Sequence, residues 1–333
     1  MEITVRAAEI DDRRAINRLL LQLDQTEHRL HPERCRRPLA ATLRTRWQQR
    51  GQVLTALVAA GANGRLLGVL SYSCQEINQS PTRVAAVLLH IHRLAVDAAC
   101  RRQGVGSALL RRALALAAEY GANRVELSVT ESNEPALRLY ERWGFSTAER
   151  EMLRPAGSLM ARTGQDFNQA DVHVRRATPA DTPALIGLLR QIGQWHHELR
   201  PDLFCPGAQK YTPEQLGQRL AKKDWHILVA ENAAGKICGH IFCRVGKWRG
   251  HPGYKNAGFL FIDDLCVDAQ CRGRGIGAAL LRQAAALAGR RRFLLLDVTE
   301  GNKNALRFYE QHGFLRYRQG MGRAVASAEA SPC

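Results

Sequence analysis

Apolar and polar positions along the 333-residue chain predict the same order of elements twice. Apolar or alternating runs, typical of strands, occupy 3–7, 53–60, 66–74, 84–96 and 124–130, then 172–177, 226–231, 236–244, 257–267 and 292–298. Helical spacing predicts helices capped by Asp11 or Asp12 and by Asp181, and others at 39–50, 104–120, 133–142, 213–222, 275–289 and 302–311. Proline-containing segments at 28–38 and 197–212 interrupt the pattern, and a final strand or hairpin closes each half.

The repeat is also visible residue by residue. Residues 94–106 read LAVDAACRRQGVG, and residues 265–277 read LCVDAQCRGRGIG. Further on, residues 127–145 read LSVTESNEPALRLYERWGF, and residues 296–314 read LDVTEGNKNALRFYEQHGF. An internal repeat of this length predicts two domains of similar architecture. The expected organisation is a domain at 1–153, a linker at 154–170, a second domain at 171–323 and a flexible tail at 324–333.

Composition and charge narrow the class of protein. Hydrophobic residues make up 45% and charged residues 24%, as expected for a globular protein. No apolar run approaches about 18 residues, and the N-terminal MEITVRAAEIDDRR lacks the apolar core of a signal peptide, so we expect a cytoplasmic protein without membrane spans. Nine scattered cysteines without a C-x-x-C pair predict neither a disulfide framework nor a zinc site. The net charge of +17 favours an acidic ligand only weakly, because the basic residues are spread along the chain without a nucleic-acid motif and can also reflect an arginine-rich composition with no specific role.

Each copy contains an Arg-x-x-Gly-x-Gly loop between a strand and a helix. Glycines let backbone N–H groups turn inward, and the helix start adds its positive dipole end, so the loop is suited to a phosphate or pyrophosphate. Neither copy continues with the Gly-Lys-Ser/Thr of a Walker A loop. Leu109 and Leu280 stand where a dinucleotide fingerprint needs its third glycine. The two commonest phosphate loops are therefore excluded, while a plain glycine turn that starts a helix remains the structural alternative.

An asparagine and a tyrosine recur beyond the loops. Asn133 and Asn302 can cap the following helices or contact an amide-containing ligand. Tyr140 and Tyr309 lie two helical turns further on, on the same face. A helical tyrosine is often a core residue, but a phenol with a pKa of about 10 can also protonate a leaving thiolate.

Together these motifs resemble the GCN5-related N-acetyltransferases, an acetyl-CoA-dependent superfamily. The resemblance rests on Val-x-x-x-x-Arg-x-x-Gly-x-Gly followed by Asn-x-x-Ala-x-x-x-Tyr-x-x-x-Gly-Phe, and it covers both halves of the chain. It implies an α/β fold of two tandem domains, each a mixed, splayed central sheet flanked by helices. It also implies acetyl-CoA as the cofactor, with pantetheine in the cleft and the pyrophosphate on the glycine loop.

The resemblance assigns matching residues to the cofactor in both copies. In the second copy they are Leu265, Cys266, Val267, Arg272, Gly273, Arg274, Gly275, Ile276, Gly277 and Asn302. In the first they are Leu94, Ala95, Val96, Arg101, Arg102, Gln103, Gly104, Val105, Gly106 and Asn133. Tyr309 and Tyr140 match the residue that often protonates the CoA thiolate, and a backbone N–H near Cys266 or Ala95 would stabilise the oxyanion.

The two copies differ at the strand before the loop, where the second reads FIDDLCV and the first HIHRLAV. Asp263 is our expected base, with Asp264 second, because successive strand residues face opposite ways and only one can point into the cleft. In the alternative interpretation both carboxylates only bind a basic group at the sheet edge. The first copy has His92 and Arg93 there; His92 can act as a base, but we interpret the first copy as a support for the second that binds acetyl-CoA or a vestige of it.

The expected function is direct acetyl transfer from acetyl-CoA to an amine of a small molecule or peptide, mainly through the second domain. An acyl-CoA-binding regulatory module without turnover is the alternative; binding to nucleic acid or a membrane is not expected, and the chain is taken as a monomer or homodimer. His196 and His197 stand beside Glu198, but adjacent histidines are poor co-ligands, so no metal is predicted. We expect these histidines to contact substrate or solvent.

Overall fold

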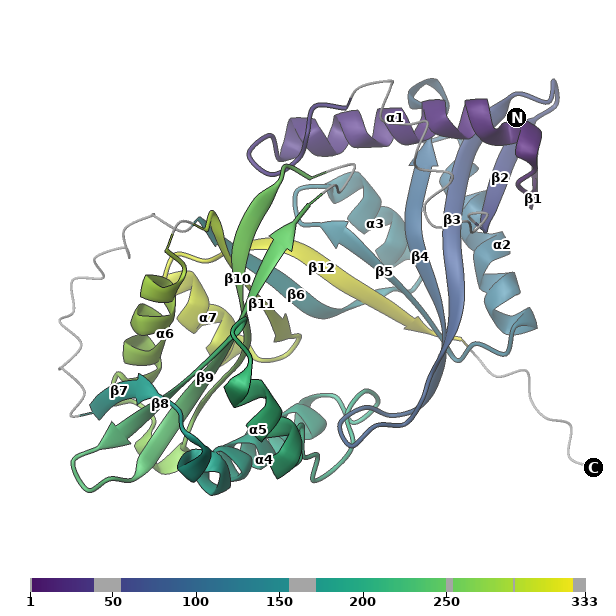
Figure 1. Cartoon of the computed structure of the whole chain (residues 1–333). Helices are drawn as coiled ribbons and strands as arrows, with labels where there is room; N and C mark the ends of the chain where they lie inside the picture. Colours follow the sequence, from purple (N-terminus) through teal and green to yellow (C-terminus); the bar gives the residue numbers. More distant parts are fainter. Residues whose placement is uncertain (1, 39–54, 156–171, 250–253, 290, 326–333) are drawn as a thin grey trace, which may run out of the picture.

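The computed structural model describes residues 2–38, 55–155, 172–249, 254–289 and 291–325 (Figure 1). The expected helix at 39–50 lies outside the described residues, as do most of the expected linker and of the expected tail. No helix in the described ranges combines the length and the apolar character that crossing a membrane requires.

Both halves have the same order of elements. The first contains β1 (Ile3–Ala7), α1 (Arg13–Leu30), β2 (Ala56–Gly61), β3 (Leu66–Ile77), β4 (Ala86–Val96), α2 (Val105–Glu119), β5 (Arg124–Thr130), α3 (Glu134–Arg142) and β6 (Ser146–Pro155). The second contains β7 (Val172–Arg176), α4 (Thr182–Leu199), α5 (Pro213–Ala221), β8 (Trp225–Asn232), β9 (Ile237–Trp248), β10 (Ala257–Val267), α6 (Ile276–Leu287), β11 (Phe293–Thr299), α7 (Lys303–Gln311) and β12 (Leu315–Ala324). Every expected element within the described residues is present, with ends shifted by a few positions.

The strands of the described residues form one mixed sheet across both halves. Their order is β1-β2-β3-β4-β5-β12-β6-β11-β10-β9-β8-β7. Neighbours are antiparallel except β4 with β5 and β10 with β11. Parallel neighbours need a crossover, which α2 and α6 provide. The expected α/β fold with a mixed sheet flanked by helices is confirmed.

The last strands of the two halves are exchanged. β12, from the end of the chain, lies between β5 and β6, and β6, from the end of the first half, lies between β12 and β11. Figure 1 shows β12, in yellow, running beside strands of the first half. Sequence analysis placed a final strand in each half but did not predict its partner. Each half therefore completes its sheet with a strand of the other.

The exchange also carries side chains between the hydrophobic cores. Met321 of β12 is 1% exposed and belongs to the first core, together with residues of α2 and β5. Met152 of β6 is 0% exposed and packs in the second core, which includes Phe314. These methionines stand at matching positions of the repeat, so the exchange is symmetric.

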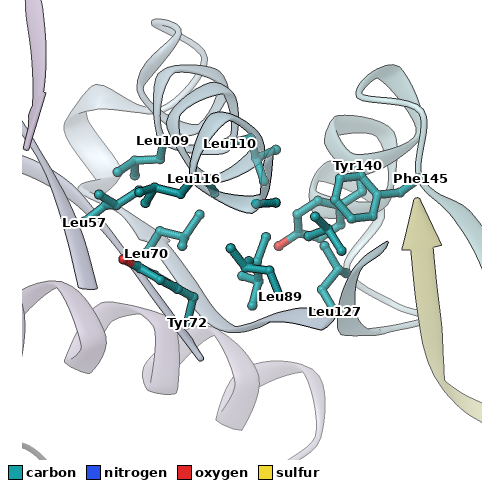
Figure 2. Close-up of a cluster of buried hydrophobic side chains, with 14 of the residues drawn as sticks. Leu57, Leu70, Tyr72, Leu89, Leu109, Leu110, Leu116, Leu127, Tyr140 and Phe145 are labelled. Carbon is teal, nitrogen blue, oxygen red and sulfur yellow. The ribbon is translucent and has the colours of Figure 1, made fainter. Parts of the chain in front are cut away.

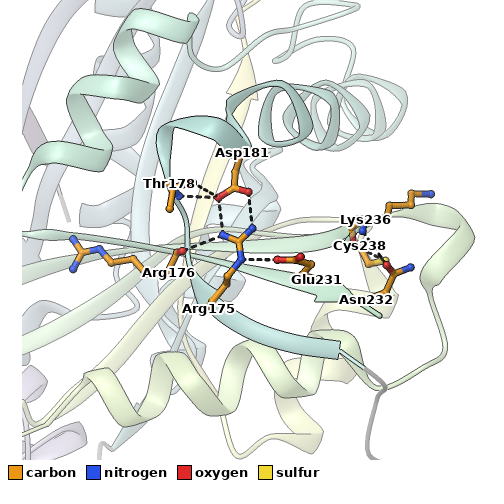
Figure 3. Close-up of polar contacts among 8 residues, drawn as sticks. All are labelled: Arg175, Arg176, Thr178, Asp181, Glu231, Asn232, Lys236 and Cys238. Atoms are coloured by element: carbon orange, nitrogen blue, oxygen red, sulfur yellow. Dashed lines mark hydrogen bonds and ion pairs between the residues drawn. The ribbon is translucent and has the colours of Figure 1, made fainter. Parts of the chain in front are cut away.

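An arginine–aspartate pair fixes the start of the first helix in each half. Arg175 of β7 makes a bidentate contact with Asp181, with both distances 2.8 Å (Figure 3). Its hydrogen bonds lower the pKa of Asp181 to about 2. Arg6 and Asp12 make the same contact in the first half. Asp12 and Asp181 occupy the N-cap positions of α1 and α4, as expected. Their side chains make no cap bond to these helices, because each accepts the backbone N–H three residues earlier, in a 3-10 turn that precedes the helix.

The segment after the first long helix of each half lies against a loop of the other half. Cys35 forms an isolated antiparallel bridge with Tyr254, and Phe204 forms one with Arg83. Arg34, 3% exposed, pairs with Glu151 at 2.8 Å. Its guanidinium also lies 4.0 to 4.9 Å from the ring centroids of Trp248, Tyr254 and Tyr317. The loop at Arg83, in the first half, thus lies against the second half, and the loop at Tyr254, in the second half, lies against the first.

We predict that Met321→Ala lowers the free energy of unfolding by about 2–5 kcal/mol, because it opens a cavity in the first core. Chemical denaturation measures this change. Leu315→Ala is the matched control on the same strand: Leu315 is 64% exposed, so its truncation is expected to cost about 0.5 kcal/mol or less. Equal effects of the two substitutions would contradict the exchange of β12 into the first core.

Candidate active site

The parallel strand pairs separate before their strands end. β10 pairs with β11 only as far as Ile262 and Leu296, although both strands continue. β4 pairs with β5 only as far as Ile91 and Leu127. Beyond these points each pair opens into a wedge whose inner backbone groups are free of that ladder. The splayed sheet expected from the resemblance is therefore present in both halves.

The glycine loops lie at the open ends of these wedges. Gly104 and Gly275 precede α2 and α6 directly, with φ of 88° and 74°. This left-handed conformation suits glycine and leaves the first N–H groups of each helix without an intrahelical partner. Gly273 also has a positive φ, 76°, but the first copy has Arg102 there, with φ 61°. The first loop therefore has a side chain in a backbone conformation that favours glycine.

Most residues assigned to the cofactor line a cavity at their loop. The second copy's cavity, of about 390 Å³, is lined by Leu265, Cys266, Val267, Arg272, Gly273, Gly275, Ile276, Gly277 and Asn302, among others. The first copy's, of about 1090 Å³, is lined by Leu94, Ala95, Val96, Arg101, Arg102, Gly104, Val105, Gly106 and Asn133, among others. Gln103 and Arg274 are not lining residues. The Gln103 side chain instead donates to the carbonyl oxygen of Ala99 at 3.0 Å.

In the second half another cavity adjoins the loop cavity. It has a volume of about 290 Å³ and lies over β10 and β11. Asn302 and Tyr309 line both cavities, so the two meet at these side chains. The Asn302 side chain accepts the Ala305 N–H at 3.1 Å and caps α7, whereas Asn133 makes no cap bond to α3. Capping and ligand contact are thus compatible at Asn302.

The two tyrosines have different surroundings. Tyr309 is 7% exposed and reaches both cavities of the second half. Burial raises its pKa above the usual range, and the charge of Asp264 adds to the effect. Tyr140 packs beside Phe145 in the first core and does not line the cavity at its own loop (Figure 2). Burial raises the pKa of Tyr140 to about 12.

Asp263 and Asp264 both contact one ammonium group. Lys210 Nζ lies 2.9 Å from Asp263 Oδ2 and 3.2 Å from Asp264 Oδ2. We expected only one carboxylate in the cleft, but the β9–β10 register shifts between Ile262 and Asp264. Asp263 is therefore the extra residue of a β-bulge, and the bulge removes the alternation on which that expectation depended. In the alternative interpretation of the sequence both carboxylates bind a basic group, and the contact with Lys210 is of this kind.

The hydrogen bonds of the two carboxylates differ. Asp264 is 9% exposed, and His240 Nε2 lies 3.0 Å from its Oδ1. Burial would raise the pKa of Asp264, but Lys210 and His240 outweigh it and hold this pKa below its usual range. Asp263 Oδ2 also accepts the hydroxyl of Tyr211 at 2.9 Å. Asp264 is thus a buried anion held by two partners, while Asp263 lines the cavity over β10 and β11.

The first copy has the opposite charge at the position of Asp264. Arg93 stands there and pairs with the buried Asp24 of α1. His92, which matches Asp263, forms a hydrogen bond of 2.8 Å with the Ser73 hydroxyl, and burial lowers its pKa. The first wedge therefore lacks the carboxylate pair of the second.

Sequence analysis missed two carboxylates in the cavity over β10 and β11, Asp297 of β11 and Glu149 of β6. Asp297 had a signal in the sequence, because Ser128 stands at its place in the first copy. Glu149 had none, since it belongs to the first half and reaches the cavity only through the strand exchange. Arg83 lines the same cavity and also comes from the first half.

The recurring histidines hold the chain after the first long helix. His197 Nδ1 donates to the carbonyl oxygen of Phe204 at 2.8 Å, and His28 makes the matching contact with Cys35 at 3.2 Å. His196 lines the cavity over β10 and β11, and burial lowers its pKa. His197 thus fixes the segment after α4 while its neighbour His196 faces the cavity.

Comparisons with known proteins agree with this geometry. The model of the Acetyltransferase (GNAT) family matches residues 20–145 and 192–314, well over half of the chain. A mycothiol acetyltransferase of Saccharomonospora viridis is 26% identical over 253 residues, which are 69% of this chain and 74% of the relative. A streptothricin acetyltransferase of Streptomyces lavendulae is 37% identical over 89 residues, 27% of this chain and 43% of the relative.

A solved structure shares the fold over the whole chain. The crystal structure of a GCN5-related N-acetyltransferase from Sphaerobacter thermophilus has a TM-score of 0.56 and 19% identity, and the match covers 97% of this chain and 96% of that one. At this identity the similarity concerns the fold alone.

We predict that Lys210→Met lowers the free energy of unfolding by about 2–4 kcal/mol at pH 7, because Asp264 stays charged and buried without its ammonium partner. Below about pH 4, the usual pKa of an aspartate, the penalty is expected to shrink as Asp264 takes up a proton. Thermal and chemical unfolding across this pH range test the prediction. Lys222→Met, at an exposed lysine, is the control; a penalty independent of pH would argue against the ion pair.

Proposed function

Since this chain belongs to the GNAT family of acetyltransferases, we propose that it transfers the acetyl group of acetyl-CoA directly to an amine of a small molecule or peptide, mainly through its second half. We assign the reaction mainly to the second half because of how its two cavities are arranged. Its loop cavity meets the cavity over β10 and β11 at Tyr309 and Asn302, whereas Tyr140 is packed away from the first loop's cavity.

The second loop fits the pyrophosphate of CoA. Gly273 and Gly275 have positive φ, and α6 begins at Ile276, so backbone N–H groups and the helix dipole favour an anion there. A Cβ on Gly277 would lie 3.3 Å from the Phe308 ring, so glycine keeps α6 close to α7 beside the loop. Pantetheine would then follow the wedge past Asn302 toward the second cavity. Acetyl-CoA supplies the activated thioester, and this chain's residues orient it and manage the protons.

Tyr309 is the proposed proton donor to the leaving sulfur. Its raised pKa keeps the phenol protonated at neutral pH, as a donor must be. Asp263, with Asp264 behind it, provides negative charge that draws the ammonium form of the acceptor to the wall of the second cavity. No covalent intermediate with the chain is required, because the amine can attack the thioester directly.

The first half has a supporting role in this proposal. Its large loop cavity is suited to acetyl-CoA or part of it, but Arg93 and Asp24 replace the carboxylate arrangement of the second wedge. This difference favours an acyl-CoA-binding role without turnover for the first half alone. Tyr140 is its candidate proton donor only if the core around it opens.

We predict that Gly275→Glu abolishes acetyl transfer and acetyl-CoA binding at the second site, because it adds bulk and negative charge where the pyrophosphate would lie. Gly104→Glu is the matched variant, with the same backbone conformation in the first loop, and we expect it to leave turnover in place. Calorimetric titration of acetyl-CoA gives the number of sites, and release of free CoA thiol gives the rate. Full activity of Gly275→Glu would refute the assignment of catalysis to the second half.

We predict that Tyr309→Phe lowers kcat about 10²-fold or more with a smaller change in KM, because the leaving thiolate loses its proton donor. Tyr140→Phe is the control at the matching position and is expected to keep kcat within about 2-fold. Steady-state kinetics with a responsive amine measure both. Parallel thermal unfolding separates lost chemistry from lost stability, and equal losses in the two variants would exclude a special role for Tyr309.

A further inference from the structure

Asp297 stands at the point where the second wedge opens. The parallel ladder of β10 and β11 ends at Ile262 and Leu296, so the next residues along the two strands are Asp263 and Asp297. Both line the cavity of about 290 Å³ that also contains Tyr309. Two carboxylates therefore face the place where the thioester would meet the acceptor in the proposed function, on which this inference rests.

The two carboxylates differ in what they already bind. Asp263 Oδ2 accepts hydrogen bonds from Lys210 Nζ and from the Tyr211 hydroxyl, both at 2.9 Å. A proton arriving on that oxygen would compete with both donors. Within the described residues, no hydrogen bond or ion pair engages the side chain of Asp297, although its backbone belongs to the β6–β11 ladder. Of the two carboxylates at the point where β10 and β11 separate, Asp297 is thus the one that is free to accept a proton.

Most charged groups nearest Asp297 are also acidic. Glu151 stands directly opposite it in the β6–β11 ladder and is bound to Arg34, while Glu149 stands opposite Thr299 on the same face. A Cβ on Gly320 would lie 2.9 Å from Glu149 Cγ, so glycine at this position of β12 leaves the room that Glu149 occupies. The other titratable and charged groups lining the cavity are Asp263, Asp264, His196, Lys210, Arg83 and Tyr309.

These surroundings favour the protonated form of Asp297. Burial raises its pKa to about 7, and the charges of Glu149, Glu151 and Asp263 add to the effect. Solvent nevertheless reaches Asp297, whose residue surface is exposed, and its burial is that of a side chain surrounded by the walls of a concave cavity. A base whose pKa lies near neutral pH can both accept a proton from an ammonium group and return it to solvent. Burial likewise raises the pKa of Glu149.

The first copy lacks this arrangement. Ser128 replaces Asp297, and Arg318 of β12 stands opposite Thr130, where Glu149 stands opposite Thr299 in the second copy. The second wedge thus has two acidic side chains where the first has a serine and an arginine. The two wedges share a backbone arrangement but differ in their chemistry. This difference agrees with turnover in the second half only.

We propose that Asp297 is the group that takes the proton from the acceptor's ammonium, and that Glu149, brought in from the first half by the strand exchange, is a positioning residue that keeps Asp297 suited to this role. Asp263 then holds the acceptor-side wall through Lys210 and Tyr211. The catalytic unit consequently includes a side chain from each half of the chain.

The proton and electron balance is simple. One N–H bond of the ammonium breaks and its proton goes to Asp297, which later releases it to solvent. The nitrogen lone pair forms the C–N bond, the C–S bond breaks with its electron pair going to sulfur, and the phenol proton of Tyr309 goes to that sulfur. The second proton lost from nitrogen restores Tyr309 through solvent. The products are the acetylated amine, free CoA and one proton.

The test compares pH profiles of kcat/KM between about pH 5 and 9 for the full chain and four variants. The acceptor probes are a linear diamine, an aminoglycoside and a peptide with a free N-terminus, and thiol release from acetyl-CoA is the readout. For wild type we expect kcat/KM to fall on the acid side of about pH 7, where Asp297 is protonated. Asp297→Asn is expected to lose about 10²-fold or more and to lose this acid limb.

The other variants separate positioning from chemistry. Glu149→Gln removes a neighbouring negative charge, so the pKa of Asp297 falls and the acid limb moves to lower pH while turnover persists. Asp263→Asn is expected to change KM and to keep the limb. Ser128→Ala, at the matching place in the first copy, is the control and is expected to leave the profile unchanged.

A direct titration makes the result independent of the acceptor. Carboxyl ¹³C resonances of the labelled protein should include one that titrates near pH 7, is absent in Asp297→Asn and moves to lower pH in Glu149→Gln. An acid limb that survives in Asp297→Asn and disappears in Asp263→Asn would overturn the proposal and make Asp263 the base. If neither the acid limb of kcat/KM nor the carboxyl resonance moves in Glu149→Gln, the role proposed for Glu149 is overturned. If wild type neither binds acetyl-CoA nor acetylates any probe, the proposed function itself fails.

Discussion

The pairing of strand edges is the constraint on which this structure depends. A strand that leaves its backbone N–H and C=O groups unpaired in the middle of a sheet loses hydrogen bonds that water cannot replace there. β6 and β12 meet this requirement by pairing with each other and with one strand of the opposite half. The positions of Met152, Met321 and Glu149 follow from that ladder. The sheet is therefore one continuous unit, although the sequence divides into two similar parts.

The order of elements could be predicted from the sequence because it depends on local periodicity and on glycine and proline positions. Strand partners could not, since alternation fixes which face a side chain occupies but not which strand lies beside it. The same limit explains the site. The glycine loops, Asn302 and Tyr309 are encoded in short contiguous motifs, whereas the proximity of Glu149 to Asp297 depends on a contact between distant segments. At Asp263 and Asp264 a local rule was applied correctly, but a bulge overrode it.

The two halves show how one scaffold accommodates different electrostatics. At the strand before the glycine loop, the second half has the anion Asp264 on the strand and the cation Lys210 on the facing segment. The first half has the cation Arg93 on the strand and the anion Asp24 on the facing helix. Either arrangement neutralises a buried charge, as the low polarity of the interior requires. The arrangement of the second half leaves Asp297 and Glu149 as further carboxylates that line the cavity over β10 and β11.

The reciprocal bridges, Cys35 with Tyr254 and Phe204 with Arg83, have a consequence for the history of such a chain. Here deletion of the first half would remove Arg83 and Glu149 from the second half's cavity and leave β11 without its neighbour β6. The two copies can diverge in charge and reactivity, but neither can be lost without removing part of the other's structure.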